Sequence, residues 1–95
     1  MIRINDNTII IDNTIATLED KRDLQIAFIR LMNEGYDEIR IDMMRTSHLP
    51  SELIGFLLDK KREMLKNGMI MKIIAINETL RKLFDNIEIS KFLNL

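Results

Sequence analysis

The sequence predicts an α/β domain in which helices pack against a mixed β-sheet. Three features of residues 39–76 carry this prediction. Residues 39–43 alternate apolar and polar like a half-buried strand, residues 54–65 repeat apolar side chains at helical spacing, and residues 69–76 are almost wholly apolar, like a buried strand. A helical crossover of this length implies that the two strands run parallel. With the flanking segments, the predicted order is ββαβαβαα.

The N-terminal part is predicted to form a β-hairpin followed by a helix. Residues 2–11 read as two short apolar strands around the turn sequence Asn5-Asp6-Asn7. The helix start resembles a capping box, with Thr17 followed by Asp20 three residues later, and Gly35 ends the helix. Apolar residues at positions i, i+3, i+4 and i+7 predict one buried stripe. These are Leu24, Ala27, Phe28 and Leu31.

The central unit is predicted to be a strand, a loop, a helix and a second strand. Residues 46–50 form the loop, which a proline closes. Ser51 is predicted to be the helix N-cap, because its hydroxyl can accept from free backbone N–H groups of the first turn. Asn67-Gly68 ends the helix. Residues 69–76 are expected to form a central strand covered on both faces.

Two further helices are predicted at the C-terminal end. Asn77 is expected to cap a helix from Glu78 to about Asn86, and Ser90 a last short helix. The side chains expected to reach the core are Leu80, Leu83 and Phe84 from the first helix, and Phe92, Leu93 and Leu95 from the second.

Size and composition predict a single domain over residues 1–95, cytoplasmic and either a monomer or a weak dimer. Lys and Arg number 14 and Asp and Glu 15, so the chain has no basic excess for nucleic acid. The absence of Cys excludes disulfides and thiolate zinc sites. No apolar run approaches the roughly 20 residues of a membrane span, and the N-terminus lacks a signal-peptide pattern, so membrane insertion is not expected.

Few residues suggest catalysis. His48 is the one histidine, and next to Ser51 it is either a general base or metal ligand or, as we expect, an ordinary loop residue. Asp42 ends a strand but has no companion carboxylate at metal-binding spacing. The glycines stand alone, so there is no phosphate-binding loop. The sequence therefore predicts a protein that is not an enzyme and holds no metal or cofactor.

The start of the central helix leaves two questions open. Residues 53–58 are apolar or glycine, so Leu53 and Phe56 either form an exposed patch that docks a partner or are buried between the sheet and a neighbouring helix. Ser51 is either a cap or a phosphoacceptor, because a helix N-terminus stabilises an added phosphate.

The sequence resembles a STAS domain, the fold of bacterial anti-sigma factor antagonists and of sulfate-transporter tails. The family has a strand ending in Leu-Asp-Leu, then Asp-Ser-Ser-Gly or Asp-Ser-Thr-Gly, then Leu-Gly-Val-Leu-Leu, and Lys-Arg-Gly-Gly before the next strand. The similar segments here, found in the same register, are Ile41-Asp42-Met43, Pro50-Ser51-Glu52-Leu53, Ile54-Gly55-Phe56-Leu57-Leu58, Lys66-Asn67-Gly68-Met69, residues 77–84 and residues 89–92.

The resemblance implies a phosphorylation switch at Ser51, which an anti-sigma factor that is a serine kinase would phosphorylate and a PP2C-type phosphatase would reset. Three positions depart from the family motif: Pro50 replaces its Asp, and Glu52 and Leu53 replace its Ser or Thr and its Gly. An acidic position common after the second strand is Ala16 here. The alternative is a STAS subunit of an ABC-type transport complex, without a switch. The expected partner-binding residues are Thr46, Ser47, His48, Leu49, Pro50, Ser51, Glu52, Leu53 and Phe56.

Overall fold

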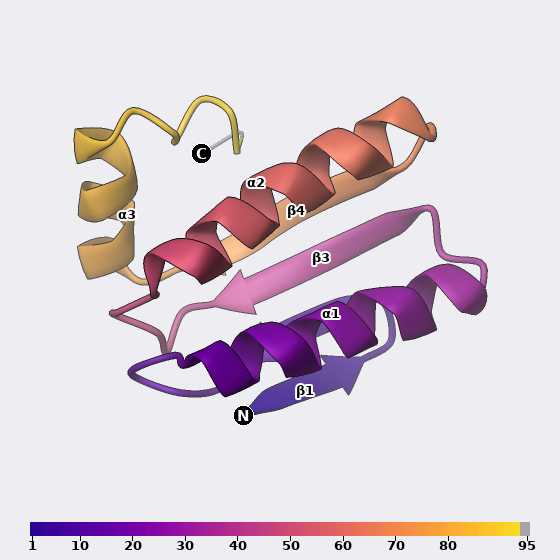
Figure 1. Cartoon of the computed structure of the whole chain (residues 1–95), viewed down its shortest axis with the longest axis horizontal. Coiled ribbons are helices and arrows are strands. Elements are labelled where there is room, and N and C mark those ends of the chain that lie inside the picture. Colours follow the sequence, from indigo (N-terminus) through magenta and orange to yellow (C-terminus); the bar gives the residue numbers. More distant parts are fainter. Residues whose placement is uncertain (94–95) are drawn as a thin grey trace.

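The computed structural model describes residues 1–93 and shows a four-stranded mixed sheet in the order β1-β2-β3-β4. The strands are β1 (Ile2–Asn5), β2 (Thr8–Ile11), β3 (Glu38–Met43) and β4 (Ile70–Ile76). The hairpin strands β1 and β2 are antiparallel, whereas β2, β3 and β4 run parallel to one another. The predicted α/β class is therefore confirmed, including the parallel strands on either side of the central helix (Figure 1).

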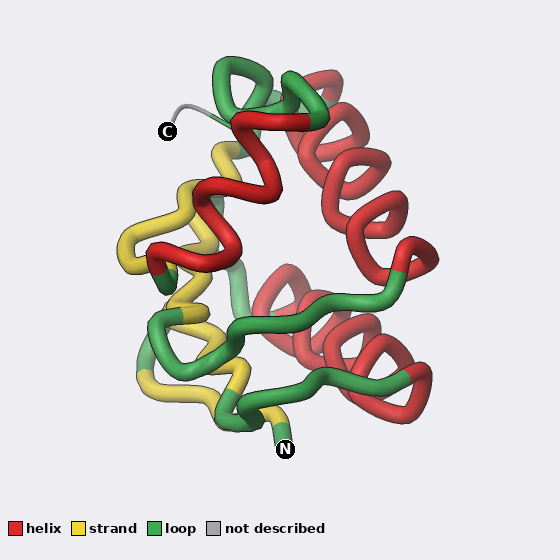
Figure 2. The backbone as a smooth tube through the Cα atoms, turned by 90° about the vertical axis from the view of Figure 1, so that its left-hand side faces the viewer, coloured by secondary structure: helices red, strands yellow, loops and turns green. Residues whose placement is uncertain are grey.

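Two long helices cover one face of this sheet. Helix α1 (Leu18–Asn33) connects β2 to β3, and helix α2 (Ser51–Lys66) connects β3 to β4. Figure 2 shows both on the same side of the strands. Helix α3 (Glu78–Asn86) follows β4 and lies beyond the ends of β3 and β4 (Figure 1). The domain thus has two layers, with the core between the sheet and the α1–α2 pair.

Four of the predicted turn and cap residues shape the chain locally as expected, namely Asp6, Thr17, Gly35 and Asn77. Asp6 lies in the hairpin turn with a φ of 53°, and Gly35 follows α1 with a φ of 91°. Thr17 and Asp20 form the capping box of α1, in which each side chain accepts from the backbone N–H of the other residue. Asn77 caps α3 by accepting from the N–H of Thr79 at 2.8 Å. These polar contacts satisfy donors that every helix start leaves free.

The core draws its side chains from every layer. Helix α1 buries the four apolar residues of its predicted stripe, together with Asp20. The strands contribute alternate residues, because successive side chains point to opposite faces of a sheet. The strand residues that are buried on the helix side are Ile9, Ile11, Ile39, Ile41, Met43, Met71 and Ile73.

The prediction that residues 69–76 form a central strand is wrong, because β4 is an edge strand. Its burial alternates: Met71 and Ile73 lie in the core, whereas Ile70 and Ile74 are about half exposed. Both long helices pack on the same face, so the opposite face of the sheet has no covering layer within residues 1–93. A nearly continuous apolar run therefore marks here a strand with exposed isoleucines.

A buried lysine binds one backbone carbonyl on the free edge of β4. Ile70 donates its N–H toward the β3 side, to Asp37, so the carbonyl of Met71 faces away from β3. Lys61 on α2 donates to that carbonyl at 3.2 Å, although its side chain is almost fully buried. Burial lowers the pKa of the Lys61 amine. A charged group at a strand edge discourages pairing with another chain.

The C-terminal predictions hold in part. Leu80, Phe84 and Leu93 are buried as predicted, but Leu83 and Phe92 are each 37% exposed. Residues 87–93 form turns instead of a second helix, and the Ser90 hydroxyl donates to the Asp85 carboxylate instead of capping. Arg62 lies over the Phe92 ring, 5.2 Å from its centroid, so a cation contacts this partly exposed ring. The prediction for Leu95 lies outside the described residues.

Candidate functional site

Two loops meet at the carboxyl ends of β2 and β3. Residues 12–17 follow β2 and residues 44–50 follow β3, and because these strands are parallel both loops emerge at the same end of the sheet. Ile15 and His48 form a parallel bridge between them, with the Ala16 N–H donating to the His48 carbonyl at 3.0 Å. In Figure 2 the two loops run side by side into α1 and α2. The first residues of α2 are therefore held beside the loop after β2.

Thr46 anchors this pair of loops from inside. Its hydroxyl lies 2.7 Å from the Asn13 carbonyl and 3.1 Å from the Ile11 carbonyl, and its side chain is fully buried. Thr46 was expected at the partner-binding surface, and this expectation is wrong. A threonine hydroxyl inside a loop satisfies backbone carbonyls that water cannot reach.

We expect Thr46→Val to lower the free energy of unfolding by about 1–3 kcal/mol, because valine keeps the shape but leaves buried carbonyl groups without this donor. Urea denaturation measures the loss. Thr79→Val, at an exposed position in the first turn of α3, is the matched control and should change the free energy by less than about 0.5 kcal/mol. Equal losses in the two variants would contradict the anchoring role.

Ser51 lies at the start of α2 and is exposed, but it is not the cap. Pro50 occupies the N-cap position with extended backbone, and no side chain caps the helix there. Ser51 is instead the first helical residue. The predicted cap is therefore wrong by one residue, because Pro50 has an extended backbone with a ψ of 152°, which makes it the non-helical boundary. Glu52 is also exposed, and its charge lies at the positive end of the helix.

The neighbouring polar side chains are Ser47 and His48. The Ser47 hydroxyl lies 2.8 Å from Nδ1 of His48, whose side chain is exposed. Asp42 turns back to accept from the N–H of Met44 at 3.0 Å and contributes nothing to this pair. Within residues 1–93, no three His, Asp or Glu side chains gather where they could hold a metal ion. The Ser47 hydroxyl and the His48 imidazole are thus polar groups that this loop presents at the surface.

Leu53 and Phe56 were both expected to contact a partner, and the structure places them differently. Leu53 is fully buried, so its expected role at the surface is wrong. Phe56 is half-buried between the helices, with its ring edge-on to Phe28 at 5.9 Å between centroids. The Lys60 amine lies 5.7 Å from the centroid of Phe56. Residues 53 and 56 therefore hold α2 against the core and against α1.

Ile15 is the apolar residue of this surface that sequence reasoning missed. Its side chain is 63% exposed, and it is bridged to His48. In the sequence, Ile15 belongs to the segment that leads into α1. Its long-range pairing with residue 48 could not be inferred from spacing. We define the loop-pair surface as seven exposed or half-exposed residues from these two loops and the start of α2: Ile15, Ser47, His48, Leu49, Pro50, Ser51 and Glu52.

Comparison of the chain with protein-family models, with curated proteins and with solved structures finds no match. None of the helices in the described part of the chain has the length and apolar character needed to cross a membrane. The comparisons thus add no relative to the STAS resemblance of the sequence.

Proposed function

We propose that the chain is a STAS-like regulatory domain that binds another protein in the cytoplasm, as an anti-sigma factor antagonist does, without catalysing a reaction. One observation supports this most: Ser51, Glu52, His48 and Ile15 are exposed together on the loop-pair surface. It combines an apolar side chain with hydroxyl, imidazole and carboxylate groups. Such a mixture suits a reversible protein interface better than a closed reaction site.

Phosphorylation of Ser51 is the proposed switch. The hydroxyl is exposed on the first helical residue of α2, where free backbone N–H groups and the helix dipole favour an anion. A phosphate adds about −1.5 to −2 charges at neutral pH. Because Glu52 is already negative and Ile15 belongs to the same surface, the added charge would oppose a partner that buries both. The proposed partner is an anti-sigma serine kinase, with a PP2C-type phosphatase restoring the free hydroxyl.

The test is a titration of the chain with a purified anti-sigma serine kinase from the source organism. We expect Ser51→Asp to weaken binding by at least about tenfold and Ser51→Ala to bind within about threefold of wild type. Thr79→Asp introduces the same charge in the first turn of α3 and is the matched control, which should bind like wild type. Mass spectrometry after incubation with ATP should locate the phosphate on residue 51. Tight binding by Ser51→Asp, or a phosphate elsewhere, would overturn the switch.

A constitutive STAS subunit of an ABC-type transport complex is the second candidate. The observation that favours it is Glu52, whose permanent negative charge lies beside Ser51. A phosphate on Ser51 would therefore only add to a negative charge that is already present. In that case Ser51→Asp and Ser51→Ala should both bind the permease–ATPase as wild type does. Charge reversal by Glu52→Lys should weaken that complex, and an unchanged affinity would argue against this candidate.

A further inference from the structure

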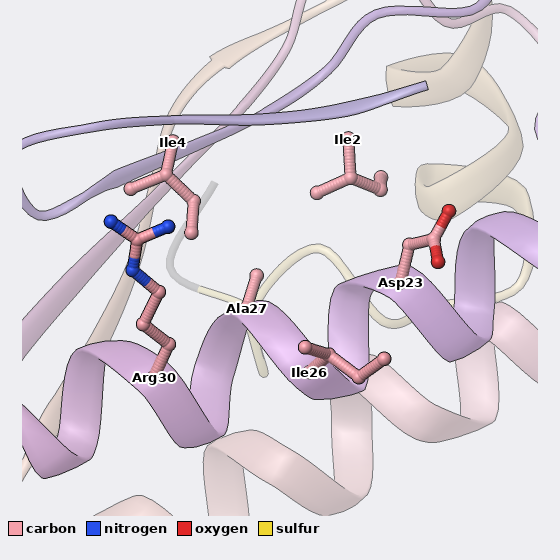
Figure 3. A pocket seen from close by; sticks show the side chains of 6 residues that line it. All are labelled: Ile2, Ile4, Asp23, Ile26, Ala27 and Arg30. Atoms are coloured by element: carbon pink, nitrogen blue, oxygen red, sulfur yellow. The ribbon is translucent and has the colours of Figure 1, made fainter.

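A groove separates edge strand β1 from helix α1, on a surface distinct from the loop-pair surface. It has a volume of about 200 Å³ and is lined by Ile2, Ile4, Asp23, Ile26, Ala27 and Arg30. Figure 3 shows the two β1 isoleucines pointing toward the helix, with the carboxylate near one end of the groove and the guanidinium near the other. The groove is thus apolar in its middle and oppositely charged at its two ends.

The outer side of α1 is unusually apolar. Leu18, Ile26 and Ile29 are each at least half exposed, and they lie opposite the buried stripe of the same helix. Ile26 is 57% exposed and also lines the groove. No element within residues 1–93 covers these side chains. Exposed branched side chains beside an apolar groove are typical of a surface that another molecule covers.

The charges on α1 are arranged so that a second copy of this chain would complement them. Asp23 and Arg30 are seven residues apart, which is about two helical turns or roughly 10 Å along α1, with Ile26 between them. If a second copy packs its α1 antiparallel, with a two-fold axis beside Ile26 and Ala27, each Asp23 faces Arg30 of the other copy. The same axis places each Ile26 at the groove of the other copy, where Ala27 leaves room for it.

We propose that the chain forms a two-fold symmetric homodimer through the α1–β1 groove. A two-fold axis makes a surface bind itself, so one favourable contact between unlike residues occurs twice. Arg30 is free to change partners, because its present contact is an exposed ion pair with Glu34 within the same helix. A contact made by one helix and one short strand is smaller than the standard interface of about 1,600 Å², so the dimer should be reversible and of modest affinity.

Charge reversal tests the pairing directly. In sedimentation velocity runs from about 10 μM to about 1 mM, we expect Asp23→Arg alone and Arg30→Asp alone to raise the dimer dissociation constant by at least about tenfold. The double reversal should return it to within about threefold of wild type, because the charges again face their opposites. Asp59→Arg, an exposed reversal on α2, is the control and should leave the constant unchanged. Failure of the double variant to recover would overturn the proposal.

A cross-link gives a second, independent readout. The chain has no Cys, so Ile26→Cys introduces the single thiol of the molecule. Near the two-fold axis it should form a disulfide-linked dimer under mild oxidation. Leu65→Cys, at a 55% exposed position on α2, is the matched control and should stay largely monomeric. Equal cross-linking of the two variants would contradict the proposed axis. Circular dichroism melting checks that each variant folds. Loss of dimerisation leaves the proposed kinase contact untouched, because the surfaces share no residue.

Discussion

Leu53→Ala destabilises the protein by about 2–5 kcal/mol, the largest effect that we expect from a single truncation near the candidate site. Leu53 is fully buried in the first turn of α2, two residues after Ser51. Removing its side chain loses buried apolar surface and leaves a cavity that the sheet and α1 cannot fill. Urea or thermal denaturation followed by circular dichroism measures the loss.

Leu65→Ala is the control for this truncation, because Leu65 belongs to the same helix and is 55% exposed. It should cost less than about 1 kcal/mol, as for a surface side chain. The pair distinguishes a core residue from a partner-contact residue: a leucine that contacts a partner loses affinity on truncation but little stability. Equal, small losses in both variants would place Leu53 at the surface after all.

Asp20→Asn lowers the free energy of unfolding at neutral pH by about 1.5–3 kcal/mol. The Asp20 carboxylate is buried and accepts from the Asn13 side-chain amide at 2.7 Å, the Thr17 backbone N–H at 2.9 Å and the N-terminal amine at 3.0 Å. Asparagine keeps the size but loses the charge and turns one acceptor into a donor. Asn13 and Thr17 flank Ile15, so the same change should loosen the loop-pair surface.

The pH dependence of stability identifies this effect. Burial alone would raise the pKa of Asp20, but the hydrogen bonds from Thr17, the N-terminal amine and Asn13, with the charge of that amine, outweigh it and lower the pKa below 3.8. The contribution is complete above the unfolded pKa near 3.8 and is lost as the pH falls through the lower, folded pKa. Wild type should therefore lose stability in this acid range, whereas Asp20→Asn lacks this loss.

Glu19→Gln is the matched control for Asp20, because Glu19 is exposed in the same turn of α1 and shares the helix dipole. It should change the free energy of unfolding by less than about 0.5 kcal/mol. If both variants lost stability equally, the dipole and not the buried contacts of Asp20 would be responsible.

Local chemistry predicted most element boundaries, and packing decided which residues are exposed. The capping box of Thr17 and Asp20 was readable because its members lie three residues apart. The one-residue error at Ser51 arose because proline and serine both signal a helix start, and the backbone at Pro50 is what makes it the boundary. The exposure of Ile15 depends on a bridge to His48 between distant segments, which no local pattern encodes.

By itself, the sequence determined the α/β class, the hairpin, the buried stripe of α1 and the parallel strands around α2, because periodicity and turn chemistry act over a few residues. Only the tertiary structure decided that β4 lies at an edge, that Leu53 is buried while Phe56 packs between helices, and that the loops after β2 and β3 form one surface. The physical reason is that periodicity marks an apolar face but not its partner. Here α1 and α2 cover the same face of the sheet, which leaves the isoleucines of the other face exposed.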